Sequence, residues 1–287
     1  MLRSSLPNLC RVLTLLLLAL ISDPALAEKG LFWKAESNTA PTIYLFGSIH
    51  TDDNRVTDFS PKVLEALKSV DMFMMESESP QDPRMLQTQN PDLITRLTDK
   101  ELAQLYALAD FHVMHRDAAL RTKPWLLAVV FDSPRPLTPY AQDNLLMRLA
   151  EDYGKQVQGI ESAAEHFAVM DSLSADEQLA FLRKVLKRSQ QTKERDYERL
   201  IKAYLDGDAN KLVRLNAQVT GSMLPAPLWK KMRVKLLEER NVIMAQRLLE
   251  NAQDKSLFVT VGASHLAGPS GLINALKQAG YKLSVVK

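Results

Sequence analysis

Cysteine is almost absent from this chain of 287 residues. Its one cysteine, Cys10, lies near the N-terminus, ahead of an apolar run. The stretch from residue 28 onward therefore has no thiol, which excludes disulfide bonds, a cysteine nucleophile and a thiolate metal site. An apolar core must hold these residues together, and about 260 residues are enough to build one.

An excess of charge of one sign is also absent. The formal net charge is +2, and the first 27 residues contain Arg3, Arg11 and Asp23, so the remainder carries +1. A near-neutral chain gives no electrostatic basis for binding nucleic acid or an anionic membrane surface. We therefore expect no nucleic-acid partner. The partner that we do expect, on other grounds given below, is a peptide or small-molecule substrate.

Long hydrophobic runs are scarce. Val12–Ile21 is the longest, and it is too short to cross a bilayer, which needs about 20 residues. With two arginines before it and Ala25-Leu26-Ala27 after it, this run predicts a secretory signal peptide over residues 1–27, ahead of one domain over 28–287. A retained N-terminal anchor is the alternative. Because of this predicted signal peptide we expect an exported protein, and the rest of the chain has no segment suited to span a membrane.

The chain does contain one short phrase twice. Thr42–Phe46 leads into Gly47-Ser48-Ile49-His50, and Leu257–Val261 leads into Gly262-Ala263-Ser264-His265. Each reads as a buried strand that stops at a glycine turn, with a histidine three residues after the glycine. Ligands and catalytic groups of α/β folds gather beyond the carboxyl ends of the strands. The two histidines therefore suggest a shared site, and a metal ion bound by both is the simplest interpretation.

The phrases also continue in the same way. A helix near 61–69 and a strand at 72–75 follow the first, and a helix near 271–279 and a strand at 281–286 follow the second. Between them, helical periodicity dominates, with one short strand. The helical segments are 98–121, 141–153, 174–205 and 228–250, and the strand is 157–161. We predict an α/β fold whose mostly parallel sheet is built from two similar strand–GxxH–helix–strand units with a large helical insertion.

Two further predicted strands end on carboxylates, Glu76 and Glu161. In a parallel sheet these would meet His50 and His265 at one rim. Two imidazoles and one or two carboxylates suit Zn²⁺, Mn²⁺, Co²⁺ or Fe²⁺ with positions left open for water. Such a metal lowers the pKa of bound water toward about 7 and polarises a carbonyl. A carboxylate that is not a ligand could serve as general base.

Each of these residues has a plainer interpretation. A lone histidine after a strand is more often structural or superficial. One acid of Glu76-Ser77-Glu78 could be solvated, and Glu161 could cap the helix that follows it. Arg240, on a late helix, could orient a carboxylate or steady an oxyanion, or simply pair with Glu239 on the helix surface.

Other polar residues are assigned structural roles. His112 and His115 lack an HExxH pattern and a third ligand, so we interpret them as a partly exposed helix face, and His166 likewise. The mixed run Lys193–Arg199 reads as a solvated helix face. Trp125 could line a substrate groove, but a core position is the default.

The pairing of LFGSIH with VGASHLAGPSGLINALKQAGYKL resembles the TraB/GumN family, which includes the Tiki metalloproteases. The resemblance extends to Glu76, to Gln158–Glu161 and to Glu239-Arg240-Asn241, so it covers nearly the whole chain after residue 27. It implies an α/β core related to that of the erythromycin esterase and ChaN-like proteins.

The resemblance also implies roles. His50, Glu76 and His265 would bind a divalent metal, Mn²⁺, Co²⁺ or Zn²⁺. Glu76, Glu161 and Arg240 would serve catalysis, supported by Gly47, Gly262 and Asn241. The expected function is a periplasmic metal-dependent hydrolase that cleaves a peptide or other amide through metal-activated water. The alternative is a non-catalytic periplasmic protein that holds a metal or haem on the same fold, since a fold does not settle function.

Overall fold

The computed structural model describes residues 29–287, so the predicted signal peptide lies outside the described residues. Six strands form one sheet in the order β4-β3-β5-β2-β1-β6. Their bounds are β1 Phe32–Glu36, β2 Ile43–Ser48, β3 Met72–Ser77, β4 Gln156–Glu161, β5 Leu257–Gly262 and β6 Lys282–Val285.

The sheet is mostly parallel, as predicted. β4, β3, β5 and β2 run in the same direction. β1 is antiparallel to both of its neighbours, β2 and β6, so β6 runs with the parallel set. β1 was not predicted, because its short segment FWKAE gives little periodic signal, although Phe32, Trp33 and Ala35 are all buried.

The two predicted units interleave in this sheet. The first unit runs from β2 through helices to β3, and β5 of the second unit lies between these two strands. Ser48 is therefore paired with Gly262, and the two glycine phrases lie side by side with a shift of one residue. This pairing brings both phrases to one edge of the sheet.

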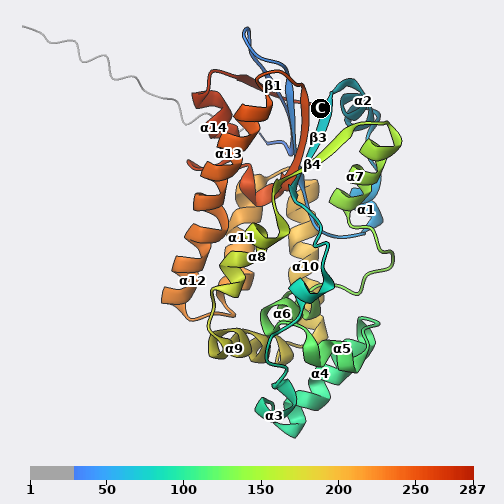
Figure 1. Cartoon of the computed structure of the whole chain (residues 1–287), viewed down its shortest axis with the longest axis vertical. Coiled ribbons are helices and arrows are strands. Elements are labelled where there is room, and N and C mark those ends of the chain that lie inside the picture. Colours follow the sequence, from blue (N-terminus) through green and yellow to red (C-terminus); the bar gives the residue numbers. More distant parts are fainter. Residues whose placement is uncertain (1–28) are drawn as a thin grey trace, which may run out of the picture.

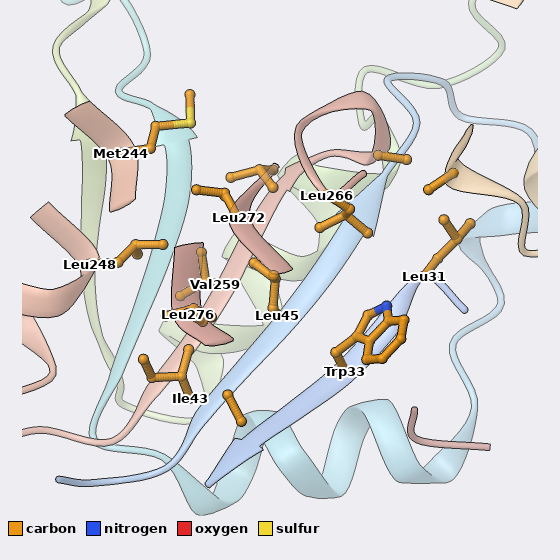
Figure 2. Close-up of a cluster of buried hydrophobic side chains, with 14 of the residues drawn as sticks. Leu31, Trp33, Ile43, Leu45, Met244, Leu248, Val259, Leu266, Leu272 and Leu276 are labelled. Carbon is orange, nitrogen blue, oxygen red and sulfur yellow. The ribbon is translucent and has the colours of Figure 1, made fainter. Parts of the chain in front are cut away.

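Helices cover both faces of the sheet (Figure 1). α13 (Arg240–Asn251) and α14 (Leu272–Gln278) lie on one face, and α2 (Pro61–Ser69) and α7 (Gln142–Asp152) on the other. Side chains alternate along each strand, so Leu45 and Val259 face α14, where Figure 2 shows Leu272 and Leu276 packed against them. Phe46 and Phe258 point to the opposite face and join α2 and α7.

The helical insertion forms its own apolar cluster beyond the carboxyl edge of the sheet, in the lower half of Figure 1. The remaining helices and helical turns are α1 Asn54–Thr57, η1 Pro83–Leu86, α3 Leu93–Arg96, α4 Asp99–Phe111, α5 Arg116–Arg121, α6 Pro124–Asp132, α8 Ala163–Asp171, α9 Ala175–Leu186, α10 Gln190–Leu205, α11 Ala209–Gly221, α12 Ala226–Arg233, η2 Val234–Glu239 and η3 Ala263–His265. Within residues 29–287, none of the helices has both the length and the apolar character needed to cross a membrane.

Several predicted helices are broken into two. The segment 98–121 divides into α4 and α5 at Val113, which adopts a positive φ of 58° that a helix interior does not allow. The segment 174–205 divides where Ser189 caps the start of α10 with its side chain. Apolar periodicity continues across both breaks, so it revealed the helical character but not the ends.

Candidate functional site

Residues from three neighbouring strand ends and one helix meet at the carboxyl edge of the sheet. Glu76 lies near the end of β3, Glu161 ends β4, and His265 closes the turn that follows β5. Arg240 begins α13 and reaches all three of these side chains. We call Glu76, Glu161, Arg240 and His265 the rim cluster.

Arg240 is the centre of the rim cluster. Its Nη2 donates to Glu76 Oε1 at 2.6 Å and to Glu161 Oε2 at 2.8 Å, and its Nε donates to Glu161 Oε1 at 3.0 Å. Both Arg240 and Glu161 are buried, at 7% and 4% exposure. Arg240 thus orients two carboxylates, and the alternative of a surface arginine paired with Glu239 is wrong.

A π-helical turn, Val234–Glu239, leads directly into Arg240. The Arg240 Nη1 group donates back to the carbonyl of Leu236 in this turn at 3.2 Å. A π turn inserts an extra residue into a helix and so changes the face on which the following side chains lie. The π turn therefore sets the direction in which the side chains of Arg240 and Asn241 project from α13.

Asn241 fixes the orientation of His265. Its Oδ1 lies 2.6 Å from His265 Nδ1, and both residues are almost fully buried. Because Oδ1 can only accept, Nδ1 carries a proton and the neutral imidazole has a lone pair at Nε2. This lone pair lies 3.5 Å from Glu76 Oε1. The supporting role predicted for Asn241 thus has a geometric basis.

The two phrase glycines allow close packing of the backbone. The Gly262 N–H donates to Glu76 Oε2 at 2.7 Å, and a Cβ at this position would lie 3.2 Å from that oxygen. A Cβ at Gly47 would lie 2.6 Å from Leu266 Cδ1. A side chain at either position would crowd the turn that carries His265.

Both carboxylates of the rim cluster stay ionised. Burial alone would raise the pKa of Glu76, but the charge and hydrogen bond of His265 in its protonated form, together with Arg240 and the Gly262 N–H, hold it well below its ordinary value. Burial also opposes ionisation of Glu161, and the adjacent His166 together with the hydrogen bonds and charge of Arg240 outweighs it, so the pKa of Glu161 is lowered. The site therefore concentrates negative charge in a place with little water.

His166 lies next to the rim cluster and contacts Arg240. The prediction that it is part of a partly exposed helix face without a role in the site is therefore corrected. The Nδ1 of His166 accepts from Arg240 Nη2 at 3.0 Å and lies 3.6 Å from Glu161 Oε2. The signal that could have found it is its position in α8, which begins two residues after Glu161. Ser162 and Glu165 form the capping box of this helix, so Glu161 does not cap it.

His50 lies apart from the rim cluster in this conformation. It follows β2 by two residues, its side chain is 74% exposed, and its Nδ1 lies 3.0 Å from Asp143 Oδ1. The hydrogen bond to Asp143 raises the pKa of His50, with Asp143 and Glu76 charges adding to this and burial opposing it. Within residues 29–287, no group of three or more His, Cys, Asp or Glu side chains is placed to hold a metal. The role of His50 as a ligand stays a prediction.

His112 and His115 do not form a site. His112 is buried rather than partly exposed, and its ring stacks on Phe131 with 5.6 Å between centroids. Burial, with smaller contributions from Lys193 and Arg135, lowers the pKa of His112 to about 4. His115 lies exposed at the start of α5.

The low pKa of His112 predicts acid sensitivity. The unfolded chain takes up a proton near pH 6.5 and the folded chain near pH 4, so stability present above pH 6.5 is lost as pH falls toward 4. The loss amounts to about 3 kcal/mol. Because His112→Phe keeps the stacking without the titration, we expect its stability relative to wild type to rise by about this amount between pH 7 and pH 4 in urea unfolding. His115→Phe is the control, and an unchanged pH profile in His112→Phe would contradict the assignment.

Two cavities adjoin in this part of the molecule, and Arg240 of the rim cluster lines one of them. One, of about 240 Å³, is lined by His166 and Arg240, and the other, of about 260 Å³, by His50. They share the wall residues Val129, Phe181 and Thr220. The cavity lined by Arg240 and the cavity lined by His50 are therefore neighbours.

The second cavity also contains charge that the sequence analysis assigned to a solvated helix face. Lys193 is buried and donates to the carbonyl of Phe131 at 2.7 Å. Asp196 is buried and accepts from Arg188 at 2.9 Å. These groups lock α10 against α6 and are not a solvated surface.

Comparison with known proteins identifies one family. The model of the TraB/PrgY/gumN family matches residues 31–285, which include every residue of the rim cluster, both glycine phrases and His166. A search of curated proteins gave no match.

Proposed function

The chain belongs to the TraB/PrgY/gumN family, and from this premise we propose that it is a metal-dependent hydrolase that cleaves a peptide or other amide bond. We also propose, from the predicted signal peptide, that it is exported and acts in the periplasm.

One observation carries the proposal of a metal. His265 Nε2 lies 3.5 Å from Glu76 Oε1 and 3.4 Å from Arg240 Nη1, and the contact of Asn241 Oδ1 with Nδ1 leaves the lone pair of the neutral ring at Nε2. Two carboxylates share one guanidinium, so the rim cluster keeps one negative charge when its imidazole is neutral. A nitrogen and an oxygen donor that face each other across an unbalanced negative charge fit a divalent cation.

The donor set agrees with the predicted ligands in part. His265 Nε2 and Glu76 Oε1 would hold the metal, and the Asn241 contact to Nδ1 is the outer hydrogen bond that metal-binding histidines usually have. His50, next to the end of the neighbouring strand, is the third ligand we propose. When bound, the metal would supply an activated water and polarise the carbonyl of the substrate.

The other residues have separate tasks. Glu161 uses both oxygens on Arg240 and is 4% exposed, so it positions Arg240 rather than exchanging protons with water. Arg240 in turn fixes Glu76. His166 accepts from Arg240 through Nδ1, so its neutral ring carries a proton on Nε2. This N–H is available to donate to the carbonyl oxygen of a substrate in the cavity that His166 lines.

Metal content provides the test. We expect one divalent metal per chain in wild-type protein purified from the periplasm and none in the His50→Ala/His265→Ala double variant. His115→Ala, which removes an exposed histidine away from the site, should keep the metal. Elemental analysis of the three proteins, followed by screening of peptide substrates with Mn²⁺, Co²⁺ and Zn²⁺, measures this.

Two results would contradict the proposal. Equal metal in the wild type and the double variant would show that these histidines are not the ligands. Metal bound through them without cleavage of any peptide or amide would favour the non-catalytic alternative.

A further inference from the structure

The cavity of about 240 Å³ beside the rim cluster is almost entirely apolar. Apart from Arg240, His166 and Thr220, its walls consist of hydrocarbon and aromatic side chains, among them Trp125, Phe167 and Trp229. Neither tryptophan contributes to the charge network described above. At Arg240 the buried charged groups border directly on the apolar wall of the cavity. A site with this arrangement is suited to bind an apolar group of a ligand next to the polar group that reacts.

The walls of this cavity are held in place. Trp125 is 4% exposed, its Nε1–H donates to Asp171 Oδ1 at 2.8 Å, and its ring lies against Phe167 with 5.6 Å between centroids. Trp229 packs so closely on Gly221 that a Cβ there would lie 2.7 Å from the indole Nε1. The shape therefore exists before any ligand binds.

The volume limits the occupant. Sites for drug-sized ligands usually measure about 300–1,000 Å³. A cavity of about 240 Å³ is smaller and holds a single side chain rather than a whole ligand. The adjoining cavity is also mostly apolar, but it differs in that the buried Lys193 and Asp196 form part of its wall.

We propose that this cavity is the specificity pocket of the enzyme and receives one large apolar side chain, of leucine, methionine or phenylalanine, from the residue adjacent to the scissile amide. This inference rests on the proposed function. A side chain that fills the pocket brings its own backbone to Arg240 and His166, because these are the polar groups that border the cavity together with Thr220.

Cleavage of a peptide library tests the pocket. With the metal-loaded enzyme we expect leucine, methionine or phenylalanine at one position next to the cleaved bond to exceed glycine, aspartate or lysine by about 10-fold or more in kcat/KM. Val129 is a half-exposed residue of the cavity wall, and the larger side chain of Val129→Phe should take up part of the cavity and so reduce this preference. Trp229→Ala enlarges the cavity and should shift the preference to larger side chains. Leu205→Phe, at an exposed apolar position outside the cavity, is the matched control.

A binding measurement separates this inference from the proposed function. N-acetylphenylalanine amide should change the tryptophan fluorescence of the wild type and of Leu205→Phe, whereas N-acetylglycine amide should not, and Val129→Phe should lose the response. If no substrate is cleaved but this pattern holds, the pocket is supported and the hydrolase fails. If cleavage occurs without side-chain preference, or both amides bind equally, the pocket is overturned.

Discussion

Replacement of Glu76 by glutamine is expected to lower kcat for amide hydrolysis by about 10³-fold or more. Glu76 accepts from Arg240 and from the Gly262 N–H through different oxygens, and glutamine has a single acceptor oxygen, so it keeps one of these two hydrogen bonds and the shape of the side chain. The negative charge that faces His265 Nε2 is lost, and with it the basis for holding a cation or accepting a proton there. Steady-state kinetics, elemental analysis and thermal unfolding of the same samples measure turnover, metal content and fold.

Glu78→Gln is the matched control for this variant. Glu78 lies two residues after Glu76 and is exposed. It is therefore the solvated acid of the segment Glu76-Ser77-Glu78, in which the sequence alone did not tell the two acids apart. It should keep nearly full turnover. If Glu76→Gln keeps more than about a tenth of wild-type kcat, the loss is smaller than acid–base or ligand chemistry normally causes, and Glu76 is not at the reacting centre.

Asn241→Ala should give a smaller effect of the same kind. Loss of an outer hydrogen bond to a ligand histidine typically costs about 10–100-fold in metal affinity or activity. Asn241 touches His265 and no carboxylate of the rim cluster, so a loss as large as that of Glu76→Gln would contradict its role as a positioning residue.

The strand ends of the rim cluster could be predicted from the sequence. Glu76, Glu161 and His265 each follow a short apolar run, and parallel strands place their carboxyl ends on one edge whatever their order. The same reasoning located the glycines, but not what they do. Gly47 and Gly262 are needed for close approach of Leu266 and Glu76, and such long-range contacts leave no local pattern.

The helical contributions were harder to predict. Arg240 and Asn241 reach the rim through the π turn before them, which breaks the 3.6-residue period on which sequence reasoning relies. His166 looked like one more residue on a helix face because its partner, Arg240, lies 74 positions away. For His50, the sequence fixes the strand that it follows, whereas its pairing with Asp143 depends on where α7 packs.

Replacement of Arg240 by methionine is expected to destabilise the protein by about 3–5 kcal/mol at pH 7. The change leaves the buried Glu161 and the partly buried Glu76 without the guanidinium that pairs with both. Urea unfolding measures the loss. Arg240→Lys keeps the charge but not the planar fork with its parallel hydrogen bonds, so it should fall between the wild type and methionine.

The pH dependence tells whether this loss is electrostatic. In the wild type the pKa values of both carboxylates are lowered, so their contribution is present above about pH 4.5 and disappears as pH falls. Without Arg240 the pKa values should rise, and protonation then relieves the repulsion. The destabilisation by Arg240→Met should therefore shrink as pH falls from 7 toward 4. A loss that stays constant over this range would instead assign Arg240 a packing role.

A triple variant distinguishes a role of the buried charges in chemistry from a role in folding. Replacing a whole buried ionic group by apolar or neutral residues is often neutral for stability, whereas removing one partner is not. Arg240→Met/Glu76→Gln/Glu161→Leu should thus recover much of what Arg240→Met loses, although it abolishes turnover. Recovery of stability without activity would mean that the rim cluster keeps its charges for chemistry rather than for folding. A triple variant as unstable as Arg240→Met would mean that these charges are needed to hold α13 against the sheet.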